Sequence, residues 1–343
     1  MKVLRLLLVA LVVAVFASAC DNDFNPNAEW RETMVVYGLL DQDSDTTWIR
    51  VQKCFLGEGD MLQMSSILDS SNYPEGELSV KIVEWDAVEK TSGGLSLLEK
   101  TSETGTVFDF QYKLLTNKRE GDFHAPSQPV YFCPTANLLD DSKIYELRVT
   151  NLKTGMTVTA ETPLIGTLES NSISVNNGNL SIFTFTSTPP RALLRWPNVA
   201  RARIYQPMIR FFYNNEGSDS LLHVDVLCPT KEATNELQMS SQINRSFFGN
   251  ELSKLITDHD TPKIMGDSIS LYLFVGDENL RMFRSISAPP TTLVQERGIY
   301  TNINGGLGIF AARRLHISRT MAVPPGSGDE NYRMFIKNLN IGF

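Results

Sequence analysis

The sequence has few of the residues on which most catalytic and metal sites depend. It contains 4 cysteines and 4 histidines among 343 residues, and no two cysteines form a CxxC pair. A zinc ribbon or a thiol–disulfide active site is therefore poorly supported. No G-x-S-x-G nucleophile elbow occurs, and the glycines at 305–308 are not followed by Lys-Ser or Lys-Thr, as a phosphate loop requires. We predict neither an enzyme nor a bound cofactor or metal.

Basic residues are outnumbered and scattered along the chain. There are 31 lysines and arginines against 39 aspartates and glutamates, which gives a net charge of −8. No run of lysines or arginines is longer than an adjacent pair such as Arg313-Arg314. A nucleic-acid partner, or an anionic membrane bound through a basic surface, is therefore not expected.

Long apolar runs are also missing, apart from a short one near the beginning. Lys2 and Arg5 precede an apolar run at 6–16, which ends in Ala-Ser-Ala at 17–19. The run is shorter than the roughly 20 residues that a spanning helix needs. This three-part layout predicts a signal peptide over 1–19.

Cys20 follows the small-residue triplet directly. This arrangement resembles the lipobox of bacterial lipoproteins, which implies acylation of Cys20 and a tether over 20–28. The resemblance implies three acyl chains, and stable anchoring requires more than one. Asp21 and Asp23 resemble the acidic tag that exports such proteins to the cell surface. We predict a lipid-anchored outer-membrane protein that faces the cell surface. Two alternatives stay open: the periplasmic face of the membrane, and a plain secreted protein in which the cysteine is incidental.

The other cysteines are Cys54, Cys133 and Cys228. An exported protein meets an oxidising compartment, so one disulfide among three pairings is allowed. Because no spacing favours any pairing, buried and chemically inert thiols are the preferred interpretation.

Short β-like runs broken by turn residues fill the first half. Several strands at close spacing without a helical period predict a mainly β fold, with an immunoglobulin-like sandwich over 29–165. The segment at 86–140 is rich in turn residues and is predicted to be loop-rich. The expected strands are 34–40, 47–56, 77–85, 144–151 and 155–163, with an acidic turn, DQDSD, after the first.

The second half restarts with β-like runs after a linker near 163–174. It is predicted to form a larger β-sandwich domain over 168–343, with helices near 231–257, where good helix formers gather. The expected strands are 180–188, 192–199, 202–215 and 268–275. The end of the chain at Phe343 is expected to be an edge strand.

Three groups of residues each suggest a functional site, but in each case a structural interpretation is preferred. Asp41, Asp43 and Asp45 alternate as in a calcium loop, but the glycine and glutamate that such a loop needs are missing, so a solvated turn is preferred. Asp258-His259-Asp260 is interpreted as an exposed loop rather than a metal or acid–base site. Four tryptophans could form a glycan-stacking platform, but a core position is preferred: Trp30, Trp48, Trp85 and Trp196.

The last hundred residues resemble a Bacteroidetes family of outer-membrane lipoproteins with a domain of unknown function. The matching motif is a Phe-x-Gly turn, a Gly-Asp strand start, then Thr-Asn-Ile followed by glycines and Phe. The positions are Phe248, Gly249, Gly266, Asp267, Thr301, Asn302, Ile303, Gly306, Gly308 and Phe310. Members are often encoded beside TonB-dependent receptors, so the resemblance implies an accessory role to a nutrient receptor.

These observations predict a non-enzymatic binding or accessory module. Its expected contact regions are the loops at 57–76, 112–130 and 214–222. Two alternatives stay open, an adhesin or fimbria-like surface subunit and a cryptic glycan-processing hydrolase. A small-molecule or glycan ligand cannot be named from the sequence.

Overall fold

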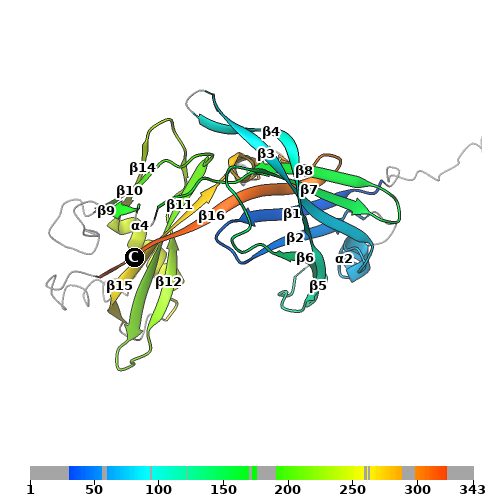
Figure 1. The fold of residues 1–343 in the computed structure, drawn as a ribbon. Helices are drawn as coiled ribbons and strands as arrows, with labels where there is room; N and C mark the ends of the chain where they lie inside the picture. Colours follow the sequence, from blue (N-terminus) through cyan, green and yellow to red (C-terminus); the bar gives the residue numbers. More distant parts are fainter. Residues whose placement is uncertain are drawn as a thin grey trace, which may run out of the picture.

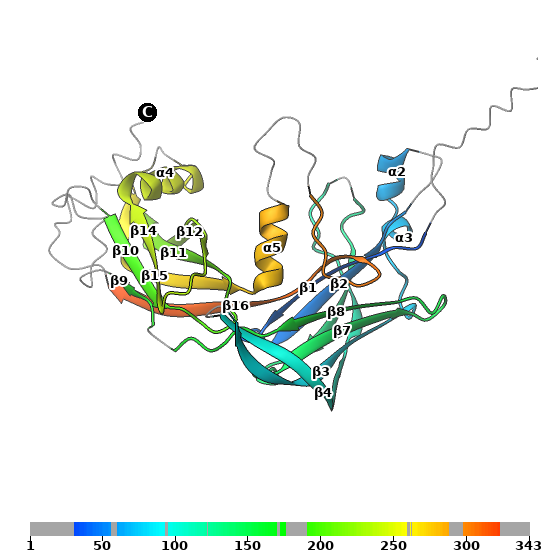
Figure 2. The ribbon, with the colours of Figure 1, turned by 90° about the horizontal axis from the view of Figure 1, so that it is seen from above.

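The computed structural model describes residues 31–55, 60–92, 95–121, 123–169, 172–175, 191–258, 261, 263–287 and 298–322. Strands dominate this part of the chain (Figures 1 and 2). The helices are α2 (Met61–Ser65), α3 (Leu68–Ser71), α4 (Arg245–Leu255) and α5 (Glu278–Ile286). The prediction of a mainly β chain with sandwich character is confirmed.

The strands form three sheets. The largest has the order β12-β11-β15-β16-β1-β2-β6-β5, with β13 also paired to β11, and the others are β4-β3-β7-β8 and β14-β10-β9. The strands of the first half are β1 (Met34–Asp41), β2 (Thr46–Lys53), β3 (Leu78–Ser92), β4 (Leu95–Asp109), β5 (Gln111–Leu115), β6 (Gln128–Pro134), β7 (Ile144–Asn151) and β8 (Thr157–Pro163). Those of the second half are β9 (Ser174–Val175), β10 (Arg191–Pro197), β11 (Ile204–Asn215), β12 (Leu222–Leu227), β13 (Lys231–Glu232), β14 (Gln238–Asn244), β15 (Lys263–Gly276) and β16 (Leu307–Ala322).

In the first half, β4-β3-β7-β8 packs face to face against β1, β2, β6 and β5. In β2, Thr47, Ile49 and Val51 are buried, whereas the residues between them are not. This period of two is the pattern of a strand with one face in a core. Tyr145 and Leu147 of β7 are buried on the opposing sheet and belong to the same core. Figure 2 shows that α2 and α5 lie on the side of the large sheet that faces away from β3, β4, β7 and β8.

In the second half, β10 and β14 pack over β11 and its neighbours. Trp196 is fully buried and contacts Tyr205, with ring centroids 5.6 Å apart. Phe248 of α4 closes another part of this core against Phe211, at a centroid distance of 6.0 Å. Aromatic pairs at such distances add to the free energy gained by burying their area.

One sheet runs through both halves. β16 pairs in parallel with β1 and antiparallel with β15, so it connects strands from either side of the expected boundary near 165–168. In Figure 1, β16 extends from the first sandwich into the second. Residues 168–343 therefore contribute a strand to the sheet of the first sandwich. The end of the chain, with Phe343, lies outside the described residues.

Several expected elements are present. The hairpins β1–β2 and β7–β8 are antiparallel with the expected turns between them, and 268–275 lies within β15. The expected strand at 180–188 lies outside the described residues. Helix α5, which was not predicted, begins after Asp277, whose side chain accepts a hydrogen bond from the Leu280 amide. Aspartate before a run of helix formers is a start signal that was available in the sequence.

Two expected elements are wrong. Much of 86–140 is strand, since β3 and β4 continue as a paired arm. Residues 88–91 of this arm are exposed, so the sequence there lacks the alternation of apolar and polar residues that predicts a strand. Before residue 245, the segment 231–257 contains β13 and β14 rather than helix, and the helix in this segment is α4 alone. In β14 the buried residues are Met239, Ser241 and Ile243, a period of two that outweighs the helix propensity of their neighbours.

The glycine-rich motif at 305–308 forms the turn that leads into β16. Gly305 and Gly308 have φ values of +80° and +107°, in the region that favours glycine. Asn302 accepts a hydrogen bond from the Phe310 amide (2.9 Å) and donates one to the Phe310 carbonyl (2.7 Å). Phe310 itself is fully buried. The motif therefore holds the start of β16 against β1.

Candidate functional site

Two of the three expected contact regions lie side by side. Residues 60–72 form α2 and α3, and the Asp60 side chain caps α2 by accepting from the Leu62 amide (2.8 Å). The loop between β5 and β6 lies against α2, since the His124 amide donates to the Ser65 carbonyl (3.0 Å). The third region, at 214–222, joins β11 to β12 in the other sandwich and lies far from α2 in Figure 1.

The two adjacent regions expose large apolar side chains. Met61, Leu62, Ile67 and Phe123 are each between 45% and 66% exposed, and we call these four residues the α2 patch. Single exposed apolar residues are ordinary, but several on one surface are typical of an interaction site. The patch is held in place by His124, whose Nδ1 lies 3.0 Å from the Ser66 carbonyl oxygen.

The tryptophans do not share one environment. Trp196 is in the core as predicted, but Trp48 is 41% exposed, so its predicted core position is wrong. Ile49 and Val51 point inward from β2, which forces Trp48 to the outer face. Trp48 packs on Phe132 with ring centroids 5.5 Å apart. Trp85 is partly buried under the Lys100 ammonium, and Trp30 lies outside the described residues.

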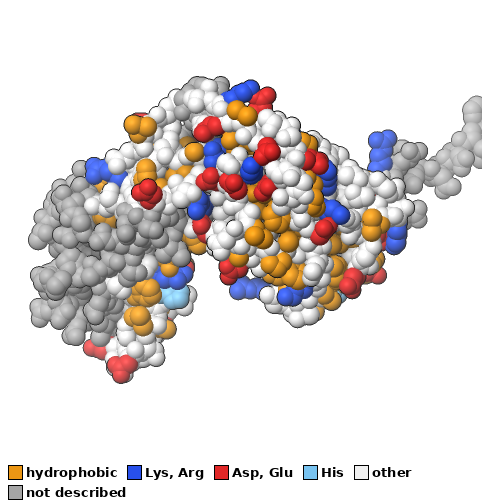
Figure 3. All heavy atoms as spheres, viewed as in Figure 1, with side chains coloured by type: hydrophobic (Ala, Val, Ile, Leu, Met, Phe, Trp, Pro, Cys, Tyr) orange, Lys and Arg blue, Asp and Glu red, His pale blue; other side chains and the backbone are white. Residues whose placement is uncertain are grey.

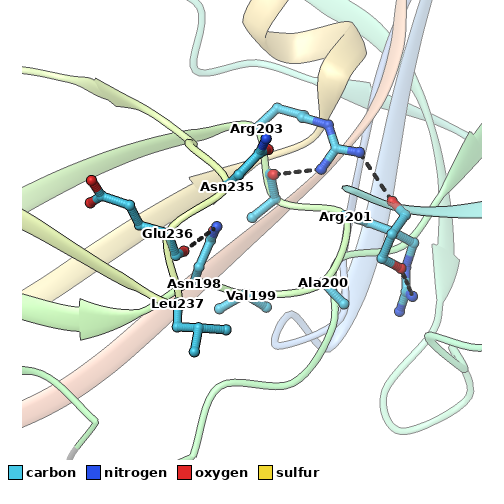
Figure 4. A pocket seen from close by; sticks show the side chains of 10 residues that line it. Asn198, Val199, Ala200, Arg201, Arg203, Asn235, Glu236 and Leu237 are labelled. Atoms are coloured by element: carbon cyan, nitrogen blue, oxygen red, sulfur yellow. Dashed lines mark hydrogen bonds between the residues drawn. The ribbon is translucent and has the colours of Figure 1, made fainter. Parts of the chain in front are cut away.

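A pocket of about 160 Å³ lies where the β3–β4 arm meets the second half (Figure 4). Its polar groups are engaged with the protein. Arg201 donates from Nε to the Leu164 carbonyl (2.7 Å), Arg203 donates to the Ser96 carbonyl (3.0 Å), and Asn198 donates to the Glu236 carbonyl (3.0 Å). The arrangement ties segments of the two halves together. Ser96 also lines the pocket, and its hydroxyl donates to the Glu89 carboxylate at 2.5 Å.

Charged side chains on the four-stranded sheet pair with one another. Lys100 bonds to Glu146 at 2.9 Å, and Arg148 bonds to Glu103 at 2.6 Å. Figure 3 shows acidic and basic side chains next to one another over this part of the molecule. Since the charges alternate, this surface has no strong preference for a ligand of either sign.

The acidic turn after β1 is partly ion-paired. Asp41 is buried and accepts from Arg313 at 3.0 Å, and Asp43 accepts two hydrogen bonds from Arg314, at 3.0 and 3.1 Å. The expectation of a solvated turn is therefore wrong for Asp41, whereas Asp43 and Asp45 are exposed. Within the described ranges, no group of three or more His, Cys, Asp or Glu side chains could hold a metal ion.

The remaining predicted residues fall into two classes. Cys133 and Cys228 are buried thiols, and burial raises the pKa of Cys228 to about 12, which suppresses its reactivity. Cys54 is an exposed free thiol, so its predicted burial is wrong. Cys20, His259 and Asp260 lie outside the described residues. No helix in the described part is long and apolar enough to cross a membrane.

Asp277 is a buried carboxyl at the start of α5. Its Oδ2 accepts a hydrogen bond from the Thr162 hydroxyl of β8 at 2.7 Å, and Oδ1 accepts from the Leu280 amide at 2.9 Å. Burial nevertheless raises the pKa of Asp277 to about 6, because it disfavours the charged form. The carboxyl links α5 to the first sandwich.

This shifted pKa predicts a pH-dependent stability. The folded-state pKa of about 6 lies above the roughly 3.9 of an unfolded aspartate, so the stabilisation is complete below about pH 4 and is lost as the pH rises through 6. Between about pH 4 and pH 7 the wild type should lose unfolding free energy on the order of 2 kcal/mol, and Asp277→Asn should not show this loss. Urea unfolding of both proteins at each pH measures the difference. Parallel pH profiles would contradict the assignment.

Comparisons with known proteins leave the family unassigned. No family model and no curated protein matches the sequence. Similar solved structures include a chain of a cytokine receptor complex, at 9% identity and a TM-score of 0.20, covering 85% of this chain and 100% of that one. Another is CBD12 from CALX1.2, at 8% identity and a TM-score of 0.13, covering 82% and 100%. At these TM-scores the likeness carries no argument about fold or function, and the resemblance to Bacteroidetes lipoproteins stays a prediction.

Proposed function

We propose that this chain is a non-enzymatic binding module, anchored to the outer membrane through acylated Cys20, that docks a partner protein on the α2 patch. The observation that carries the proposal is the convergence of two separate chain segments on one surface with exposed apolar side chains. Apolar side chains exposed to water do not stabilise the isolated fold. A docked partner would remove their apolar surface from water, which is energetically favourable.

The nature of the partner follows from the sequence resemblance. A lipid anchor would confine the module to the membrane surface, where a TonB-dependent receptor is the partner that the resemblance implies. The immunoglobulin-like character of the first sandwich fits a role in presenting loops, because such folds display loops on a rigid β framework. The described strands supply that framework beneath both segments of the α2 patch.

The anchor can be tested separately from the docking surface. We expect the full chain, expressed in a Bacteroidetes host, to incorporate labelled palmitate and to sediment with outer membranes. Cys20→Ser should abolish the label and release the protein. An unlabelled wild-type chain would exclude the anchor and leave the docking proposal to be tested on its own.

Docking is tested by substitution within the patch. Burying a large apolar side chain contributes about 1.5–3 kcal/mol, so Leu62→Ser with Phe123→Ser should weaken capture of a TonB-dependent receptor by at least about tenfold. The melting temperature should be unchanged, since both side chains are exposed. Photo-crosslinkers placed at residues 62 and 123, followed by mass spectrometry, identify the captured receptor.

Leu237 supplies a matched control. It is 91% exposed and lies between β13 and β14, away from the α2 patch in sequence and in the fold. Leu237→Ser should leave receptor capture unchanged, and a crosslinker at residue 237 should give no receptor adduct. Equal capture by the patch variant and the wild type would overturn the docking proposal.

A further inference from the structure

Arg50 occupies an unusual position on the outer face of the large sheet. It lies in β2, is only partly exposed, and its Nε is buried without a hydrogen-bond partner. Within the described residues its guanidinium makes no ion pair. Other arginines differ: Arg210 forms two bonds to Asp225, at 2.7 and 2.8 Å. A buried donor without an acceptor costs about 1–3 kcal/mol, so an unpaired Arg50 calls for an explanation.

Exposed aromatic side chains flank this guanidinium. Tyr37 of β1 is the register partner of Arg50, and Trp48 precedes it by two residues, so all three share one face of the sheet. Tyr37 is 42% exposed and Trp48 is 41% exposed. Phe132 supports Trp48 from β6, which holds the indole in place. The Lys113 ammonium lies over the Trp48 ring, 5.6 Å from its centroid. The face therefore combines two partly exposed aromatic rings with neighbouring cations.

A second cation lies close to Arg50. Burial, together with the positive charge of Arg50, lowers the pKa of Lys118 in the β5–β6 loop. Burial likewise lowers the pKa of Arg50. Among the described residues no carboxylate lies within ion-pair distance of the Arg50 guanidinium. Lys118 donates a hydrogen bond to the His124 carbonyl at 2.5 Å, whereas neither cation forms an ion pair with a carboxylate of the described residues. On a chain with a net charge of −8, this is a local concentration of positive charge.

From this geometry we infer that the face carrying Arg50, Tyr37 and Trp48 binds an acidic saccharide, with its oxyanion on Arg50 and its ring on the flanking aromatics. A guanidinium presents paired donors that match a carboxylate or sulfate group. The apolar C–H face of a sugar packs on flat aromatic rings, and a neutral sugar would leave Arg50 without an acceptor. The site borders the α2 patch, because Lys118 lies over the Phe123 ring at 5.8 Å from its centroid. The inference does not require the proposed protein partner.

The oxyanion could belong to a uronic acid or to a sulfate ester, and the probes separate these sources. Calorimetry on the full chain would use tetragalacturonate, a sulfated galactose tetrasaccharide and neutral maltotetraose. We expect at least one acidic probe to bind at least about tenfold more tightly than maltotetraose and to lose affinity as salt is raised. Arg50→Met should reduce that affinity by at least about tenfold, and Trp48→Ala should also reduce it.

Two further variants keep the test decisive. Arg119→Met removes an exposed charge from the same loop as Lys118, and it should leave binding unchanged. Arg50→Met should keep or raise the melting temperature, because it removes an unsatisfied donor; if it fails to fold, Arg50→Gln takes its place. The inference is overturned if neither acidic probe binds, if maltotetraose binds equally well, or if the Arg50 variants bind like the wild type.

Discussion

Among the Gly→Ala substitutions in the glycine motif at 305–308, Gly308→Ala is expected to destabilise the fold most. A Cβ at this position would lie 2.0 Å from the Val36 carbonyl oxygen, and the φ of +107° is unfavourable for alanine. Val36 belongs to β1, which pairs with β16 at this residue, so the clash can be relieved only by separating the two strands. We expect a loss of about 4 kcal/mol or more, at the upper end of single substitutions.

Gly305→Ala is the matched control. Gly305 also has a positive φ, of +80°, but the nearest atoms to an added Cβ are 3.7 Å away. Only the backbone cost of roughly 1 kcal/mol should apply. Thermal unfolding followed by circular dichroism compares the two variants, and equal melting temperatures would show that close packing of β16 on β1 is not the cause.

Arg201→Ala is expected to loosen the junction between the two halves. Arg201 is 8% exposed, and it donates to the Leu164 carbonyl at 2.7 Å and to the Asp141 carbonyl at 2.8 Å. Each buried carbonyl left without its donor costs about 1–3 kcal/mol, so a total of about 3 kcal/mol is expected. Urea unfolding measures this loss as a lower midpoint.

The backbone of Arg201 allows a second comparison. Its φ is +63°, a conformation that alanine disfavours and glycine adopts readily. Arg201→Gly should therefore be more stable than Arg201→Ala by about 1 kcal/mol, although both lose the same hydrogen bonds. If the two variants unfold at the same midpoint as the wild type, the junction does not depend on this side chain.

Much of the fold follows from local alternation of apolar and polar residues. The strands β1, β2, β7 and β8 bury one face against a core, so their sequences carry a period of two that can be read directly. The same rule identifies β14, where helix propensity is misleading. The exposed part of the β3–β4 arm has no buried face, and its strands therefore leave no such signal.

The candidate sites were predictable only in part. Residues 57–76 and 112–130 can be singled out in the sequence as expected contact regions, but their meeting at His124 and Ser65 depends on how β5 and β6 place one loop. Alternation in β2 assigns Trp48 to the face opposite Ile49, so its exposure could have been inferred. The unpaired state of Arg50 could not, because it depends on which acidic residues lie nearby in space.

The amino-acid order alone predicts a β-rich chain, a glycine turn before Phe310 and a lipid anchor at Cys20. These predictions are possible because strand periodicity, the glycine motif and the residues around Cys20 are properties of neighbouring positions. The parallel pairing of β16 with β1, the joining of both halves in one sheet and the surroundings of Arg50 all involve residues distant in the chain. Such contacts are selected by the packing of the whole core, since many pairings satisfy the same local pattern.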